Sequence, residues 1–419
     1  MSRVAVIGAG ISGMAAGYLL SRKHEVTLFE KAPRLGGHTH THTIETSCGP
    51  QAIDTGFIVH NDRTYPNLVQ LFRQLGVSRQ LSDMSFGVSC RQTGFEYSSR
   101  GLRGFFSHPG AWHQWKHYRF FAEILRFNHE ARQLLSDPAN GSLTLQQYLD
   151  AQKFSEDFQR LYLYPMAAAI WSTSLEEMEA FPAFTLIRFF DNHGFLGLTT
   201  QAQWYALRGG SSSYIPALTA SYRDRIRLSS NIIGVNRTAD SVQVRFADHP
   251  AESFDQVVFA CHAPQALSLL SDASPQERHV LGQFRTSRND TILHTDDRLL
   301  PRISQARASW NYHLGVGRKA ATLTYHMNRL QALPTSENYC VTLNAAEEIA
   351  SQKILREMTY FHPLYNLEAL RAQSRWAEIS GQNRTHFCGA YWFYGFHEDG
   401  LNSAIRVARS LGVDWKGGN

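Results

Sequence analysis

The chain opens with an apolar run at residues 4–7, and three glycines follow it directly. Gly8, Gly10 and Gly13 have the spacing G-x-G-x-x-G, and the apolar residues after them recur at helical intervals up to residue 20. This pattern predicts a buried strand that turns tightly into a helix. The N-terminus of such a helix binds phosphate, because its first backbone N–H groups have no partner within the helix.

A second apolar strand is predicted at residues 25–29, and Glu30 closes it. In dinucleotide-binding folds an acidic residue at this place accepts hydrogen bonds from the adenosine ribose. We therefore expect residues 1–30 to form a β-α-β unit that binds a dinucleotide. The alternative is a purely structural strand-to-helix turn.

Beyond this unit the hydrophobic period changes several times along the chain. It predicts an amphipathic helix at 66–75, a hairpin at 84–97 and helices through most of 142–204. A series of strands is then expected, followed by a closing helix. The strands are predicted at residues 226–235, 241–246, 254–261, 291–294, 321–328, 339–343 and 385–388, and the helix at 401–411.

The composition indicates a large protein with extensive apolar interior surface. A chain of 419 residues is expected to form two domains or one interrupted domain. Charged residues make up 18% and aromatic residues 12% of the chain, which favours apolar pockets. Basic residues barely exceed acidic ones, 41 against 36. Without a long basic run, nucleic-acid binding is not expected.

The five cysteines are widely spaced and include no C-x-x-C motif. We therefore expect neither a disulfide framework nor a zinc site. Cys261 is expected to be a small buried residue and not a nucleophile, because the sequence places no activating base beside it. The first strand begins near residue 3, and no apolar stretch approaches 18 residues. These features predict a cytoplasmic protein, or one that is peripheral on the inner face of the membrane.

The segment after the second strand resembles the E-x-x-x-R-x-G-G-R signature of the flavin-containing amine oxidase superfamily, which includes protoporphyrinogen oxidase and the phytoene desaturases. Glu30, Arg34, Gly36 and Gly37 match, whereas His38 stands where many relatives have arginine. A pair of glycines lets the backbone pass close to a bulky cofactor. The resemblance therefore implies FAD and not NAD.

Three histidines alternate with threonines at residues 38–43. In a strand, His38, His40 and His42 would share one face. Three interpretations are open: a metal site, hydrogen bonding near the cofactor or substrate, and plain strand patterning. A metal site is disfavoured because no acidic partner stands nearby.

Three further segments resemble the superfamily. Residues 54–57 resemble its D-x-G segment beside the isoalloxazine ring, and residues 207–210 resemble its R-G-G segment. Residues 385–400 resemble its closing motif, in which a helix that begins at Gly400 is aimed at the flavin. Ala390 departs from this motif, which has an acid after Gly389. The resemblance implies that FAD is bound by Gly8, Gly10, Ile11, Ser12, Gly13, Glu30, Lys31, Arg34, Gly36, Gly37, His38, Thr55, Gly56, Phe57, Ile233, Ala260, Gly389, Gly400 and Leu401.

The resemblance also implies the domain organisation. It predicts an α/β fold, with a Rossmann-like FAD-binding domain and an interleaved α+β substrate domain. We expect the FAD-binding domain at 1–85, 205–264 and 380–419. The substrate-binding domain is expected at 86–204 and 265–379.

The reaction implied by the resemblance is hydride transfer from a substrate carbon to flavin N5. No residue is an evident acid or base, so the mechanism is expected to depend on orientation. Typical amine oxidases place a lysine early in the second substrate segment, but this chain has none between Lys153 and Lys319. This disfavours amine oxidation in its usual form. The candidate catalytic residues are His38, His262, Trp310, Tyr391 and Tyr394.

The sequence resembles more closely still a bacterial group of predicted NAD/FAD-binding amine-oxidase-like proteins. The segments that carry this resemblance are residues 54–58, 83–86, 188–194 and 389–400. Members of that group are often encoded beside methyltransferases resembling cyclopropane fatty acyl synthase. This implies a lipid substrate with an unsaturated or methylated acyl chain, and a methyltransferase partner. The alternatives are an amine oxidase, an FAD-dependent double-bond isomerase and a non-catalytic flavoprotein partner of the methyltransferase.

Aromatic and basic residues interleave at residues 101–127. Such a segment suits a membrane interface, with aromatic rings in the headgroup region and basic groups toward anionic lipid. The alternative is a substrate-domain helix with one buried face and one solvated face.

Overall fold

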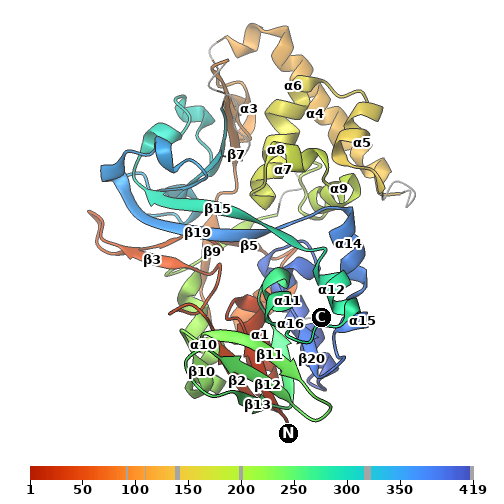
Figure 1. The fold of residues 1–419 in the computed structure, drawn as a ribbon. Helices are drawn as coiled ribbons and strands as arrows, with labels where there is room; N and C mark the ends of the chain where they lie inside the picture. The colour runs from red at the N-terminus through yellow and green to blue at the C-terminus, as the bar shows by residue number, and fades with distance from the viewer. Residues whose placement is uncertain (91–92, 109, 137–141, 198–201, 316–321, 416–419) are drawn as a thin grey trace.

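The structure is a computed structural model, and it describes residues 1–90, 93–108, 110–136, 142–197, 202–315 and 322–415. The part of the molecule that contains the N-terminus is built on a parallel sheet, and the strands of this sheet come from three separate stretches of the chain (Figure 1). The order of the strands is β10-β2-β1-β14-β20. Their bounds are Arg3–Ile7 for β1, Glu25–Phe29 for β2, Ile226–Arg227 for β10, Gln256–Phe259 for β14 and Thr385–Phe387 for β20.

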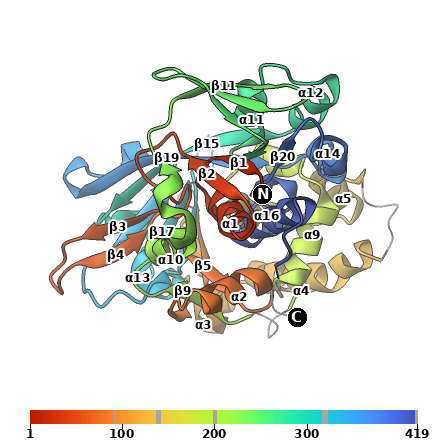
Figure 2. The same ribbon diagram turned by 90° about the horizontal axis from the view of Figure 1, so that it is seen from below.

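Two helices pack together beside this sheet, α1 (Ile11–Leu20) and α16 (His397–Ser410), at the centre of the view in Figure 2. Nine of the ten residues of α1 are buried. A helix that is hydrophobic all round needs cover on every side. The sheet and α16 supply much of it, so the two ends of the chain share one core.

Smaller elements surround this part of the molecule. An antiparallel sheet of β11 (Ile232–Arg237), β12 (Val242–Phe246) and β13 (Glu252–Phe254) lies beside α11 (Ala263–Leu269). The remaining short elements are β3 (Thr41–Ile44) paired with β4 (Gln51–Asp54), β5 (Val59–Asn61) and β6 (Arg79–Ser82) on either side of β9 (Trp204–Leu207), α2 (Pro66–Gln74) and α10 (Ile215–Thr219).

The second large sheet has seven strands in the order β19-β15-β18-β17-β16-β7-β8. Its parallel pairing of β7 with β16 joins the two segments that were expected to form the substrate domain. The long strands β15 and β19 cross the middle of the molecule (Figure 1). The bounds are Phe86–Cys90 for β7, Phe95–Ser98 for β8, Arg285–His294 for β15, Trp310–Leu314 for β16, Thr322–His326 for β17, Cys340–Leu343 for β18 and Ile354–Leu364 for β19.

Helices fill the chain between β8 and β9 and form a second hydrophobic core against the seven-stranded sheet. No helix in the described ranges is long and apolar enough to cross a membrane. The helices are α3 (Gly101–Phe105), α4 (Trp115–Leu134), α5 (Leu145–Ala151), α6 (Glu156–Phe158), α7 (Tyr164–Trp171), α8 (Leu175–Glu179) and α9 (Ala183–Asn192).

The predicted α/β class with an interleaved α+β part is confirmed, as are the helix at 66–75 and the hairpin at 84–97. Several boundaries differ. The strand predicted at 291–294 begins at Arg285, and the long strand β19 was not predicted. The strand expected at 38–43 begins only at Thr41, and the strand expected at 226–235 is broken by a turn with positive φ at Ser229. The closing helix begins at His397, because Asp399 accepts a hydrogen bond from the Phe396 N–H. Residues 91–92, Pro109, residues 198–201 and Ala321, which fall within predicted elements or segments, lie outside the described ranges.

Candidate active site

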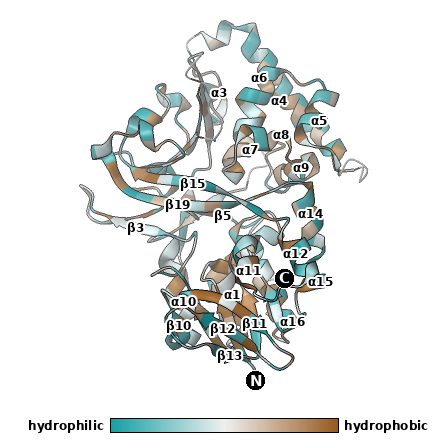
Figure 3. Ribbon diagram, in the orientation of Figure 1, coloured by the Kyte–Doolittle hydropathy of each residue, from teal (hydrophilic) through white to brown (hydrophobic). Residues whose placement is uncertain are grey.

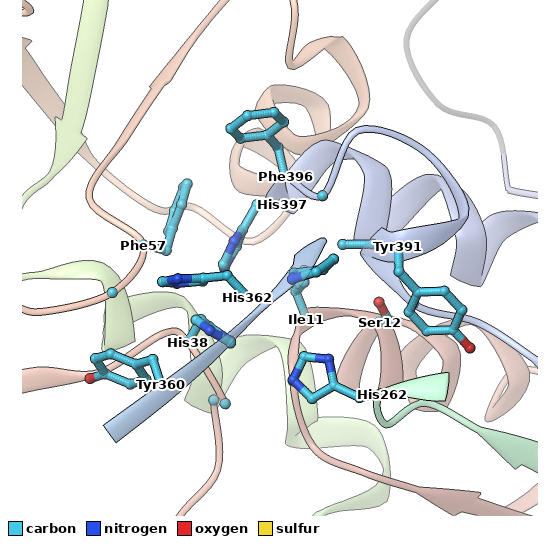
Figure 4. A pocket seen from close by; sticks show the side chains of 18 of the residues that line it. Ile11, Ser12, His38, Phe57, His262, Tyr360, His362, Tyr391, Phe396 and His397 are labelled. Atoms are coloured by element: carbon cyan, nitrogen blue, oxygen red, sulfur yellow. The ribbon is translucent and has the colours of Figure 1, made fainter. Parts of the chain in front are cut away.

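A cavity of about 550 Å³ lies between the parallel sheet and the seven-stranded sheet. Figure 4 shows side chains from both parts of the molecule pointing into it. At one end it is lined by the glycine-rich turn after β1 and by the end of β2. At the other end it is lined by the seven-stranded sheet and the helices. The cavity therefore joins the predicted dinucleotide site to the predicted substrate region.

The three glycines after β1 have different surroundings. Gly8 has φ +108°, and a β-carbon there would lie 2.8 Å from the Ala260 carbonyl oxygen. A β-carbon at Gly13 would lie 1.8 Å from the carbonyl oxygen of Gly8, so this glycine lets α1 approach the turn. At Gly10 a β-carbon would meet nothing within 4 Å, because the position opens onto the cavity.

The N-terminus of α1 is suited to an anion. Gly10 is its N-cap and supplies no side-chain acceptor, and the first turn contains no acidic residue. Ile11 and Ser12 line the cavity. Their backbone N–H groups and the positive end of the helix dipole favour negative charge here.

Glu30 lies at the end of β2 and lines the cavity. Its two carboxylate oxygens accept hydrogen bonds from the Ala9 N–H at 2.7 Å and the Ala32 N–H at 2.8 Å. These bonds fix the carboxylate beside the glycine turn. Lys31 and Ile232 line the same end, whereas Ile233, which was expected to contact adenine, is 53% exposed and does not line the cavity.

Arg34 does not line the cavity. Its guanidinium donates to the carbonyl oxygens of Leu35, Gly37 and Thr39, and so it fixes the loop that carries the glycine pair. Gly36 has φ +111°, and a β-carbon there would lie 2.3 Å from the Thr39 carbonyl oxygen. The structure thus places Arg34 as a support for the loop.

Thr55, Gly56 and Phe57 line the middle of the cavity. The Phe57 N–H donates to the His38 carbonyl at 2.8 Å, and a β-carbon at Gly56 would lie 2.0 Å from the same oxygen. Phe57 stacks on His397, with ring centroids 3.7 Å apart and planes inclined by 13°.

His38, His262 and His362 come together at the cavity wall with Tyr360 (Figure 4). The His38 ring lies 5.1 Å from His362 and 6.2 Å from His262, between centroids. Burial lowers the pKa of all three imidazoles, for His362 to about 4, so they are neutral near pH 7. No described residue hydrogen-bonds Nε2 of His38.

The hydrogen bonds around His362 identify its tautomer. Its Nδ1 lies 3.0 Å from Nδ2 of the buried Asn289, whose Oδ1 accepts a hydrogen bond from Asn344 at 2.8 Å. An amide NH₂ group only donates, so Nδ1 of His362 is the acceptor. The proton is therefore on Nε2. His362 offers the cavity a neutral N–H donor.

His397 is fixed by a second buried chain of hydrogen bonds. Its Nε2 lies 2.9 Å from Oγ1 of Thr39, which lies 2.6 Å from the Tyr214 hydroxyl. Burial lowers the pKa of His397 to about 3, so this imidazole is also neutral. As the first residue of α16, it brings the N-terminus of that helix to the cavity.

The opposite end of the cavity is apolar and aromatic. Trp310 and Tyr325 meet edge to face there, 4.9 Å apart between centroids. The helices and the strands around them add Ile170, Trp171, Phe189, His193, Phe195, Trp204 and Leu343.

Burial raises the pKa of the Cys261 thiol to about 12, so it is un-ionised at neutral pH. Cys261 lines the cavity together with Ala260, Gly389 and Ala390. All five candidate catalytic residues, His38, His262, Trp310, Tyr391 and Tyr394, line it as well.

Of the residues expected to bind the cofactor, Gly13, Arg34, Ile233, Gly400 and Leu401 do not line the cavity. Because α16 begins at His397, Gly400 packs on α1 instead. The sequence interpretation missed Tyr360, His362 and His397. Tyr360 and His362 alternate along β19, but no local signal shows which face of that strand meets the cavity. The described residues contain no group of three or more His, Cys, Asp or Glu side chains placed to hold a metal ion.

The sequence model of the family described as flavin containing amine oxidoreductase matches residues 11–289. An uncharacterized protein from Methanocaldococcus jannaschii is 57% identical over 35 residues, which are 8% of this chain and 9% of that protein.

Solved structures share the whole fold at low sequence identity. A CLA-producing fatty acid isomerase from P. acnes is 16% identical over 97% of this chain and 98% of that one, with a TM-score of 0.68. Putrescine oxidase bound to putrescine is 13% identical over 98% of both chains, with a TM-score of 0.70. Cyclohexylamine oxidase from Brevibacterium oxydans is 16% identical over 98% of this chain and 99% of that one, with a TM-score of 0.67.

Proposed function

This chain belongs to the flavin-containing amine oxidoreductase family and is an FAD-dependent oxidoreductase, and we propose that its substrate is a lipid with an unsaturated or methylated acyl chain. The proposed reaction is a dehydrogenation of that chain. The bound flavin supplies the hydride acceptor.

The residues at the first end of the cavity fit FAD. The open space at Gly10 and the first-turn N–H groups of Ile11 and Ser12 suit the pyrophosphate, and Glu30 is proposed to accept hydrogen bonds from the ribose. The buried Nε2 of His38, which lacks a partner among the described residues, faces the region proposed for the flavin. Phe57 and His397 are proposed to lie along the ring system, where the N-terminus of α16 favours negative charge.

One observation carries the choice of substrate. Among the described residues that line the cavity, the only formally charged side chains are Glu30 and Lys31, and both lie at the first end. The aromatic end offers no carboxylate to pair with an ammonium group and no lysine. Burying an unpaired ammonium group costs roughly several kcal/mol of free energy. Burying an acyl chain is favourable, because it removes apolar surface from water. The cavity therefore favours a hydrocarbon chain.

The side chains of this chain have two tasks in the proposed reaction. Trp310, Tyr325 and Phe189 hold the acyl chain and exclude water. As a hydride leaves one substrate carbon and a proton leaves its neighbour, a double bond forms between the two. His38, whose buried Nε2 has no partner among the described residues, is the base proposed for that proton, whereas His362 presents its Nε2–H to the cavity as a donor.

The proposal is tested by mixing the FAD-loaded protein anaerobically with phospholipids that carry monounsaturated, methyl-branched or saturated chains. Unsaturated or branched lipid should bleach the flavin absorbance and lose two hydrogen atoms by mass spectrometry. Bleaching by putrescine or cyclohexylamine, with none by any lipid, would contradict the proposal. His362→Leu should slow the bleaching. Phe361→Leu, an exposed neighbour on the same strand, is the matched control.

A double-bond isomerase is the second candidate function. The buried His38 favours it, because its neutral imidazole has an Nε2 without a partner among the described residues and can take a proton from one carbon and return it at another. An isomerase would move a double bond at unchanged substrate mass, without net flavin reduction or an electron acceptor. The same lipid experiment therefore distinguishes the two functions.

We also propose a methyltransferase resembling cyclopropane fatty acyl synthase as a partner, on the resemblance to the bacterial amine-oxidase-like group. Such an enzyme would supply methylated acyl chains to this one. Co-purification of the two proteins from the native cell tests the contact, and a methylated lipid that is a better substrate than its unmethylated form tests the order of reactions.

A further inference from the structure

The outer side of α4 carries an apolar stripe that the described chain leaves uncovered. Trp115, Tyr118, Ala122 and Leu125 are exposed and follow one another at intervals of three, four and three residues, so they share one side of the helix. Trp115 alone is 77% exposed. The inward side has its own buried stripe, which consists of His117, Phe120, Ile124, Phe127, Ala131 and Leu134. In Figure 3 α4 accordingly shows both hydrophobic and hydrophilic segments.

Neighbouring elements extend the stripe. Leu102 on α3 is 58% exposed, and Trp112, just before α4, is 48% exposed. The Trp112 ring stacks on Phe106 at 4.4 Å between centroids, and its carbonyl accepts a hydrogen bond from the Tyr118 hydroxyl at 2.9 Å. These contacts hold the aromatic rings in place before any partner arrives, so binding loses little side-chain entropy.

The charged residues at the start of the stripe, up to residue 122, are all basic. Residues 97–122 contain four lysines and arginines and no acidic residue. Glu96, just before this segment, is buried and accepts the N–H groups of Arg302 and Ile303. Glu123, just after it, accepts the N–H of Ser155. The basic side chains are all exposed: Arg100, Arg103, Lys116 and Arg119.

We propose that this α3–α4 face, consisting of Arg100, Leu102, Arg103, Trp112, Trp115, Lys116, Tyr118, Arg119 and Leu125, docks on the surface of an anionic lipid bilayer. Tryptophan and tyrosine rings are most stable at the headgroup level of a membrane. The apolar stripe would enter the acyl boundary, and the basic side chains would meet anionic headgroups.

The charge of the face favours a bilayer over a second copy of this chain. A symmetric dimer through this face would bring two basic surfaces together, and they would repel. A bilayer with anionic headgroups complements both the charge and the aromatic rings.

The location of the face links it to the cavity. It lies at the end of the molecule remote from the N-terminus (Figure 1). The inward side of α4 packs on α9, where Phe127 and Phe190 meet at 6.4 Å between centroids. Phe189 of α9 lines the cavity. Two helices, α4 and α9, would therefore separate a docked membrane from the substrate end. The proposed docking does not depend on the identity of the substrate.

The test is flotation of the FAD-loaded full chain with vesicles of phosphatidylcholine alone, or of phosphatidylcholine mixed with phosphatidylglycerol. We expect binding to the mixed vesicles only, and its loss at high salt. Each basic residue near an anionic surface contributes about fivefold to partitioning. Lys116→Gln with Arg119→Gln should therefore lower binding by about tenfold or more, and Trp115→Glu should lower it strongly.

Matched controls change exposed residues in the FAD-binding part: Leu228→Glu for the apolar change, and Arg22→Gln with Arg223→Gln for the charge change. These variants should float like the unaltered protein. Equal flotation of the face variants and the controls would overturn the proposal, as would the absence of binding to mixed vesicles. Loss of self-association in the face variants, without vesicle binding, would assign the face to a second copy. Unchanged flavin absorbance and thermal unfolding show that each variant is folded.

Discussion

Gly400 on α16 lies directly against Ile11 on α1: a β-carbon at position 400 would stand 2.7 Å from Cγ2 of Ile11 and 2.9 Å from Oγ of Ser12. The same two residues begin the helix whose N-terminus faces the cavity. Gly400 therefore sets how closely the C-terminal helix approaches the predicted pyrophosphate site, although it does not line the cavity itself.

Gly400→Ala is expected to destabilise the protein even without cofactor. The added methyl group must displace Ile11 or move α16, and overpacking of this kind costs about 1 to 3 kcal/mol in the free energy of unfolding. Chemical denaturation of the FAD-free protein measures this cost. An unchanged unfolding midpoint would show that the two helices separate freely.

Gly10→Ala is expected to weaken FAD binding without destabilising the protein. Its φ of −73° suits alanine, and the β-carbon would meet no protein atom within 4 Å, so the unfolding of the FAD-free protein should not change. The methyl group would instead occupy space next to the proposed pyrophosphate. We expect the Kd for FAD to rise on the order of tenfold, about 1.4 kcal/mol, as measured by fluorescence quenching of the flavin. Tight FAD binding by this variant would place the pyrophosphate elsewhere.

Local patterns were sufficient to predict the first β-α-β unit. Its apolar strand, glycines and terminal acid follow one another along the chain, so one continuous stretch of sequence contains the whole pattern. The hairpin at 84–97 and the helix at 66–75 were predicted for the same reason. Their hydrophobic periods are uninterrupted.

The parts that could not be predicted depend on contacts between distant residues. His362 meets His38 only because β19 pairs with β15 in one register, and no local signal fixes that register. The start of α16 depends on the capping bond between Asp399 and Phe396. The role of Gly400 depends on α1, which lies almost 400 residues away in the sequence. For the histidines at 38–42, the strand begins too late to hold all three on one face.

The unfolding free energy is expected to fall as the pH is lowered from about 6.5 to 4. Eight described histidines have a pKa lowered to about 4 or about 3, mainly by burial: His40, His60, His193, His294, His326, His362, His386 and His397. In this range the unfolded chain binds protons at these sites and the folded protein does not. Each site then contributes up to about 1.4 kcal/mol per pH unit.

Three buried carboxyl groups act with the opposite sign. Burial raises the pKa of Asp54 and of Asp399 to about 7 and also raises the pKa of Glu398, so the folded protein binds these protons first and gains stability as the pH falls. The histidines outnumber them, and the net effect is acid destabilisation. The Tm measured from pH 7.5 to 4.5 tests whether the net effect of acid is destabilising. A Tm that is constant or rises toward low pH would contradict it.

Asn289→Asp should reverse the tautomer of His362. The amide of Asn289 donates to Nδ1, which leaves the proton on Nε2, whereas a carboxylate in its place accepts from Nδ1–H. The new charge should also raise the pKa of His362 by about 1 to 3. Nitrogen chemical shifts of the imidazole report the tautomer directly, and the acid limb of kcat/KM should move to higher pH. Asn289→Ala, which removes the hydrogen bond without adding charge, separates the two effects: it should destabilise the protein without moving the acid limb upward. If both variants left the chemical shifts of His362 unchanged, Asn289 would not orient this histidine, and the N–H donor assigned to the cavity would lose its support.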